Sequence, residues 1–267
     1  MKLFEFYKIA NDFAPKSLSD EYCTRYGAYD NSGILVDTGD DVKSVLFSLD
    51  LSFLAIEKAL KAGANVIVTH HPAIYAKIAE INASDFQPLG EKLVKCIKNG
   101  ISVISMHLNL DCAKGGIDES LQQAVVGDER AKNLAIMHPL SGDCGYGRAY
   151  DIAPSTLQSV MNNVKERLRA EKITVYGDVT TNVSRIASFC GGGADESAVE
   201  FAVAQGAQVI LSSDFKHHVL TLAIEKGLAV IAPTHYASEN FGFEKYYKKI
   251  CQSIDLPCIF HTESSML

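Results

Sequence analysis

The sequence places two histidines side by side, directly after an apolar run and directly before a proline. His70 and His71 belong to the stretch VTHHPAIY, and a strand is expected at 65–70. Successive side chains of an extended chain point to opposite sides, and Pro72 restricts the residue before it to extended geometry. We therefore expect the two imidazoles to diverge, so that they suit two neighbouring metal ions better than one chelated ion.

Metal-capable side chains follow two other expected strands. HLNLD, which ends in Asp111, follows the strand expected at 101–107, and HYASE, from His235 to Glu239, follows the strand at 228–233. In open α/β sheets, ligands bind at the carboxyl ends of the strands. We predict a mixed N/O site for two divalent metal ions, a known hydrolytic device, in which Asp111 or Glu239 bridges the pair. Zinc, manganese, iron, cobalt and nickel all accept such ligands, and the spacing does not choose among them.

Three other polar residues are candidates for supporting roles. His107 closes its strand four residues before Asp111, and we expect it to orient a ligand or to face the substrate. In SSDFKHH, Asp214 and His218 occupy the place that the histidine pair holds in the first half. Asp214 is expected to cap a helix and His218 to face the cleft, with a solvated first turn as an equal alternative. No residue presents itself as an unambiguous general acid, so the catalytic residues stay unknown.

Two local patterns concern the backbone near these strand ends. In HYASEN, Ser238 is expected to cap a helix with Glu239 in its first turn, where a role as a helix-dipole partner alone is the alternative. The run CGGG, Cys190–Gly193, follows a strand and opens a helix. Asp195 and Glu196 would repel an anion there, so we expect a tight turn rather than a phosphate site.

Short apolar runs alternate with helical segments along the chain, which is typical of α/β architecture. AGANVIVTHH in the first half aligns with QGAQVILSSD in the second, and NGISVISM aligns with KGLAVIAP. The helical segments between the runs end in glycine, as helices often do. We expect two related α/β domains, 1–130 and 131–267, that face each other around a dinuclear metal site. The remaining strands are expected at 44–50, 185–190 and 208–213.

Composition excludes several classes of protein. The 267 residues carry a net charge of −7 and no dense basic block, which makes a nucleic-acid surface an unfavourable reading. The seven cysteines form no CxxC pair, so neither a zinc knuckle nor a disulfide framework is expected. No run reaches the ~18 apolar residues of a membrane span, and no signal peptide is evident. We expect a cytoplasmic protein without a membrane partner.

Six motifs together resemble the Nif-three-like family, whose members carry the name GTP cyclohydrolase 1 type 2. They are Asp30–Gly33 (DNSG), THHP, HLNLD, Gly145–Arg148 (GYGR), SSDFKHH and THYASE, in the order of the family. The resemblance implies two α/β domains around a dinuclear metal site and a toroidal homohexamer. It also implies a ligand set in which Glu239 is the bridge: His70, His71, Asp111, His235 and Glu239. SSDFKHH departs from the Thr-Gly pair that is common in the family, which affects the role of the two serines and not the ligands.

Two functions fit this set of residues. The first is a metal-dependent hydrolase acting on a small molecule, with the opening of the guanine imidazole ring of GTP as the activity that the resemblance implies. The alternative is a non-enzymatic metal-binding protein that regulates or scaffolds through protein contacts. A coordination position open to a water-filled cleft would favour the enzyme.

Overall fold

The computed structural model describes residues 1–78, 80–83, 88–127, 129 and 131–267. Contacts divide the chain into two units, each of which contains two segments. The first unit comprises Met1–Ala113 and Phe243–Thr262, and the second comprises Lys114–Gly242 and Glu263–Leu267. The predicted boundary falls at residue 130, outside the described residues, and the division into 1–130 and 131–267 stays a prediction.

A five-stranded sheet forms the first unit, in the order β1-β4-β3-β2-β11. The central strands β2, β3 and β4 are parallel, β11 joins β2 in parallel, and β1 pairs with β4 in the antiparallel direction. The strands are β1 (Gly33–Val36), β2 (Val45–Ser48), β3 (Val66–Thr69), β4 (Ser102–Ser105) and β11 (Cys258–His261).

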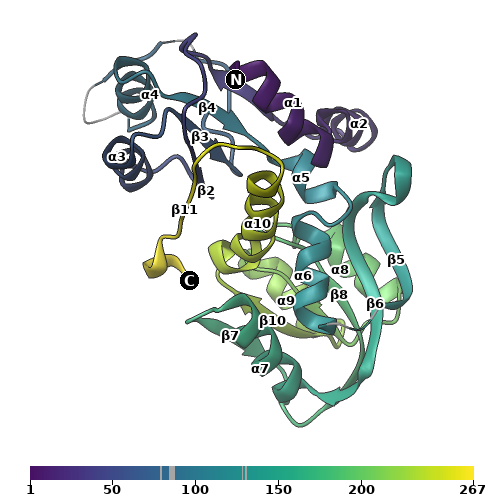
Figure 1. Cartoon of the computed structure of the whole chain (residues 1–267). Helices are drawn as coiled ribbons and strands as arrows, with labels where there is room; N and C mark the ends of the chain where they lie inside the picture. The colour runs from purple at the N-terminus through teal and green to yellow at the C-terminus, as the bar shows by residue number, and fades with distance from the viewer. Residues whose placement is uncertain (79, 84–87, 128, 130) are drawn as a thin grey trace. The chain divides into compact units, whose positions relative to one another are not determined.

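The helices α3 (Phe53–Ala62) and α4 (Pro88–Lys98) connect the parallel strands and pack against one face of this sheet (Figure 1). The Ser52 hydroxyl caps α3 by accepting a hydrogen bond from the Ala55 N–H at 3.0 Å. Gly63 ends the helix with φ +69°, a conformation that costs glycine nothing. The expected glycine ends of the helices are therefore confirmed for α3.

Aromatic side chains cover the other face of the first sheet. The ring of Phe47 on β2 lies 6.2 Å from Phe243 and 5.3 Å from Tyr247, measured between ring centroids. Both partners belong to α10 (His235–Gln252), which begins in the second unit and ends in the first. The Tyr246 hydroxyl donates to the carbonyl of Ala10 at 3.1 Å. The other helices of this unit are α1 (Leu3–Phe13), α2 (Lys16–Tyr26) and α5 (Leu108–Cys112).

A six-stranded sheet forms the second unit, in the order β5-β6-β8-β9-β10-β7. Here β8, β9 and β10 are parallel, and the other three strands are antiparallel to their neighbours. The strands are β5 (Lys132–Pro139), β6 (Gly145–Thr156), β7 (Ile173–Tyr176), β8 (Asn182–Ser188), β9 (Val209–Leu211) and β10 (Ala229–Pro233). The helices are α6 (Ile117–Val126), α7 (Leu157–Leu168), α8 (Glu196–Ala204) and α9 (His217–Glu225).

A buried ion pair lies inside the second unit. The Arg148 Nε is 2.9 Å from Asp118 Oδ2, and the two side chains are 2% and 0% exposed. Asp118 also accepts the backbone N–H groups of Gly147 at 3.0 Å and Cys190 at 3.3 Å. One carboxylate therefore joins the start of α6 to β6 and to the end of β8.

The six strands expected from the sequence are all present, three in each of two sheets, which confirms the mixed α/β fold. The aligned sequence stretches correspond to β3 with β9 and to β4 with β10. The likeness extends to strands that the sequence did not indicate, because β1 and β7 each lie antiparallel beside the third parallel strand. None of the helices within the described ranges is long and apolar enough to cross a membrane.

Candidate functional site

The first group of site residues follows β3 in the first unit. The backbone N–H groups of His70 and His71 both donate to the carbonyl of Leu49, at 3.1 and 3.0 Å. The Thr69 hydroxyl donates to the His71 carbonyl at 2.8 Å. The end of β2 therefore fixes the turn that carries the two histidines.

Three side chains of the first unit bring metal-capable atoms together. One donor atom each from His70, His107 and Asp111 lies within 4.8 Å of the others. His70 Nε2 is 3.4 Å from Asp111 Oδ1, and these side chains are 0% and 5% exposed. The ring centroid of His71 lies 4.9 Å from that of His70 and 6.0 Å from that of His107. Buried groups of this type could hold a metal ion.

The Nδ1 atom of each histidine in the adjacent pair has its own acceptor. His70 Nδ1 lies 2.7 Å from the carbonyl oxygen of Met106, and His71 Nδ1 lies 2.7 Å from Oδ1 of Asp50. Carbonyl and carboxylate oxygens only accept, so Nδ1 carries the proton in both rings. In the neutral imidazole the lone pair is then on Nε2, which is the arrangement of most metal-binding histidines.

His107 is held in the same way by a buried carboxylate. Its Nδ1 lies 2.8 Å from Oδ1 of Asp30, whose side chain is fully buried. Burial alone would raise the pKa of Asp30, but hydrogen bonds from His107, Ser19 and Ser32 outweigh it and hold that pKa well below its usual range. Burial lowers the pKa of His107, and the hydrogen bond to Asp30 with the charge of Asp111 more than reverses this, so the pKa is raised.

The second group of site residues lies at the start of α10 in the second unit. His235 Nε2 is 3.1 Å from Oε2 of Glu239, one turn further along the helix. His235 Nδ1 lies 2.5 Å from Oδ2 of Asp214, so this ring also presents Nε2. Glu239 is buried, with 4% of its surface exposed. The Thr234 hydroxyl caps the helix by accepting the Ala237 N–H at 3.1 Å.

Two expectations about α10 are wrong. Ser238 is not the cap, because the helix begins at His235 and Ser238 lies inside its first turn. Its hydroxyl donates to the His235 carbonyl at 2.8 Å and accepts the Gly191 N–H at 3.1 Å. Glu239 lies in the second turn rather than the first, which removes the reading as a dipole partner of the helix start.

Gly191 is a site residue that the sequence did not identify as one. The run CGGG forms a tight turn as expected, in which the Gly193 N–H donates to the Cys190 carbonyl at 3.3 Å. Gly191 has φ +54°, and a Cβ atom there would lie 2.0 Å from Glu239 Oε1 and 3.0 Å from His235 Nε2. Glycine is therefore required to leave room for both side chains.

The remaining candidates take other positions. Asp214 does not cap α9, because the cap position is Lys216 and no side chain fills it. The chain between β9 and α9 instead directs Asp214 to His235. His218 Nε2 contacts Glu196 Oε1 at 2.9 Å, with side chains 63% and 56% exposed. His218 is thus a surface residue of the second unit.

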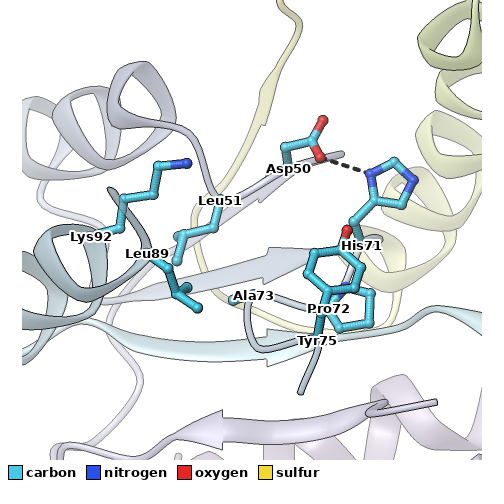
Figure 2. Close-up of a pocket in the computed structure, with 8 residues that line it drawn as sticks. All are labelled: Asp50, Leu51, His71, Pro72, Ala73, Tyr75, Leu89 and Lys92. Carbon is cyan, nitrogen blue, oxygen red and sulfur yellow. Dashed lines mark hydrogen bonds and ion pairs between the residues drawn. The ribbon is translucent and has the colours of Figure 1, made fainter. Parts of the chain in front are cut away.

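A small cavity lies beside the histidine pair in the first unit. It has a volume of about 190 Å³ and includes His71 in its wall. Figure 2 shows the hydrogen bond between His71 and Asp50 at one side of this cavity. The site of the first unit therefore adjoins space that a small molecule can enter.

The sequence matches Duf34/NIF3 (NGG1p interacting factor 3) over residues 1–265. It is 31% identical over 261 residues to a Methanocaldococcus jannaschii protein named GTP cyclohydrolase 1 type 2 homolog, covering 97% of this chain and 98% of that protein. The fold is similar to the crystal structure of a Bacillus cereus protein related to NIF3, with a TM-score of 0.83, 19% identity, and 98% and 97% of the two chains covered. It is also similar to reduced HcgD from Methanocaldococcus jannaschii, with a TM-score of 0.80, 28% identity and 97% of each chain covered.

Proposed function

Because this chain belongs to the Duf34/NIF3 family, we propose that it is a hydrolase that depends on two divalent metal ions. The observation that carries the proposal is the orientation of its histidines. In each of the three proposed ligand rings a carbonyl or carboxylate oxygen holds Nδ1, which leaves the Nε2 lone pair for a metal. The three rings are those of His70, His71 and His235.

The residues present fit a pair of divalent ions. In the proposal the first unit supplies His70, His71 and Asp111, and the second supplies His235 and Glu239. Two carboxylates among five ligands offset the repulsion between two cations, and Glu239 is the proposed bridge. Such ions lower the pKa of a bound water and stabilise negative charge that develops during hydrolysis. Zinc, manganese, iron, cobalt and nickel are all compatible with these donors.

His107 and Asp30 have a separate role in this proposal. Asp30 holds the Nδ1 proton of His107, so Nε2 of that ring can accept a proton from a reacting group. The buried carboxylate then stabilises the imidazolium that forms. In this way the pair supplies the proton-transfer group that the ligands themselves do not provide.

The names of relatives support a substrate class for this proposal. Curated proteins with up to 31% identity to this chain are named GTP cyclohydrolase 1 type 2 homolog, which supports a guanine nucleotide or a related heterocycle as the substrate. The proposed reaction is hydrolysis of a C–N bond in the heterocyclic ring.

Turnover by reconstituted protein tests this function. The protein is loaded with each of the five metals and incubated with a panel of purine nucleotides, and ring opening is followed by absorbance. We expect turnover that Asp111→Asn abolishes without loss of fold, and that Asp178→Asn, an exposed carboxylate change, leaves unaltered. Absence of turnover with every metal, together with disassembly on chelation, would favour the scaffold function instead.

The assembly state is a further part of the proposal. Resemblance to the family supports a homohexamer, which native mass spectrometry would measure directly. A monomer at micromolar concentration would contradict it.

A further inference from the structure

The cavity beside His71 is smaller than a complete ligand site. Its volume is about 190 Å³, whereas sites for drug-sized ligands have volumes of roughly 300–1,000 Å³. It can therefore hold one ring system or one polar group of a larger molecule. The residues that line it are Asp50, Leu51, His71, Pro72, Ala73, Tyr75, Leu89 and Lys92.

The lining is apolar between two polar ends. Figure 2 shows Lys92 on one side of the cavity and His71 with Asp50 on the other, with Leu51 and Leu89 between them. A wall of aliphatic side chains favours a flat hydrophobic ring over a phosphate chain. A charged phosphate placed against such a wall would lose its bound water without gaining new hydrogen bonds.

An aromatic ring is available for stacking against such a body. Tyr75 lines the cavity and is 58% exposed, so its ring remains accessible. Heteroaromatic rings stack favourably on aromatic side chains, because both present flat π-faces. The combination of Tyr75 with the aliphatic side chains fits a planar ring.

Lys92 makes the end of the cavity opposite His71 a hydrogen-bond donor. Its ammonium group lies 5.4 Å from the centre of the Phe53 ring, and that of Lys95 lies 5.8 Å from the same ring. Lys95 also lies 4.0 Å from a Glu57 carboxylate oxygen, and Lys92 is the one of the two that lines the cavity. An ammonium group only donates hydrogen bonds, so the ligand must place an acceptor there.

We propose that this cavity holds a fused heteroaromatic ring of the substrate, with the ring flat against Tyr75 and a ring carbonyl on Lys92. The rest of the ring then extends along the aliphatic side chains toward His71. A purine with a carbonyl in its six-membered ring supplies this acceptor as O6. The inference rests on the proposed function, in which His71 is a metal ligand.

Calorimetric titration of the metal-loaded protein with guanosine, adenosine and inorganic triphosphate tests the assignment. We expect guanosine to bind, and to bind about tenfold more weakly or worse to Tyr75→Leu and to Lys92→Gln. Adenosine, which lacks the ring carbonyl, should bind more weakly than guanosine to the wild type, and Lys92→Gln should remove that difference. Lys95→Gln is the matched control and should stay within about twofold of the wild type.

Three results would overturn the assignment. They are failure of guanosine to bind, equal guanosine affinity in Lys92→Gln and the wild type, and a Lys92-dependent affinity for triphosphate alone. Equal metal content and equal melting temperatures exclude misfolding of the variants. Guanosine binding that depends on Lys92 without any turnover would reject the hydrolase and keep the cavity. If guanine nucleotides are turned over equally well by Lys92→Gln and the wild type, the hydrolase function is kept and the assignment of the cavity is rejected.

Discussion

Nδ1 of His107 lies 2.8 Å from Oδ1 of Asp30, across 77 residues of sequence. The contact joins the DNSG motif near the start of the chain to the HLNLD motif after β4. Ser19 and Ser32 donate their hydroxyls to the other oxygen of Asp30. A single buried carboxylate therefore fixes the orientation of a histidine that stands beside the proposed ligands His70 and Asp111.

Removal of that carboxylate should be costly. Asp30→Ala leaves the buried hydroxyls of Ser19 and Ser32 and the half-buried ring of His107 without their acceptor. Loss of one partner of a buried charged network costs about 3–5 kcal/mol. Asp30→Ala should therefore have a lower free energy of unfolding than the wild type, which urea denaturation measures. Asp37→Ala, which removes an exposed carboxylate from a surface turn, should change it by about 0.5 kcal/mol or less. Equal effects of the two substitutions would mean that the Asp30 network contributes little.

The neighbouring glycines 191 and 192 offer a matched pair for the second unit. In Gly191→Ala the new methyl group meets Glu239 at 2.0 Å, at φ +54°. We expect a loss of about 1–3 kcal/mol of stability from the strained backbone, and displacement of the Glu239 side chain. In Gly192→Ala the nearest atom is Asp214 Oδ2 at 3.6 Å, an ordinary contact. Thermal unfolding and metal content of both variants check this, and similar values for the two would count against the role of Gly191.

The buried pair of Arg148 and Asp118 should matter more than any surface ion pair. Arg148→Met leaves Asp118 charged inside the second unit, and such a change costs about 3–5 kcal/mol. Lys248→Gln removes an exposed partner of Glu244, one turn away on α10, for which about 0.3–0.5 kcal/mol is expected. Chemical denaturation of the two variants measures both values. A loss below about 1 kcal/mol for Arg148→Met would contradict the assignment.

Thiol chemistry should follow burial. Burial raises the pKa of the Cys96 thiol to about 12, so the native protein holds almost no Cys96 thiolate at pH 8. Iodoacetamide should therefore label Cys96 only in urea, whereas the half-buried Cys144 should react in the native protein. Since the folded pKa is raised, the unfolded thiol loses its proton first, and this contribution to stability is lost as pH rises from about 9 to about 12. Native labelling of Cys96 at the rate of Cys144, read by peptide mass spectrometry, would refute the prediction.

Apolar runs predicted the parallel strands because buried strands of parallel sheets are hydrophobic on both faces. The outer strands were missed for the same reason. Every residue of β5 and β7 is exposed or half-buried, so neither strand is hydrophobic on both faces. The return of β11 to the first sheet depends on pairing with β2, more than 200 residues earlier, and no local pattern reveals such a partner.

The sequence identified those candidate site residues whose type alone indicates metal binding and which follow an expected strand. His70, His71, Asp111, His235 and Glu239 were identified in this way, and their joint role as ligands stays a prediction. Supporting residues were harder to recognise. Asp50 and Asp30 reach their histidines from distant positions in the chain, and Gly191 acts through the space that it leaves. A positive φ and a tertiary hydrogen bond leave no periodic signal in a sequence.

The number of metal ions bound to each chain tests the central claim most directly. Elemental analysis of reconstituted protein should find about two divalent ions per chain, as a two-metal hydrolytic site requires. Glu239→Gln, which weakens the proposed bridge, should lower that number more than His107→Gln does. Full occupancy in Glu239→Gln, or fewer than about one ion per chain in the wild type with every metal, would contradict the dinuclear centre.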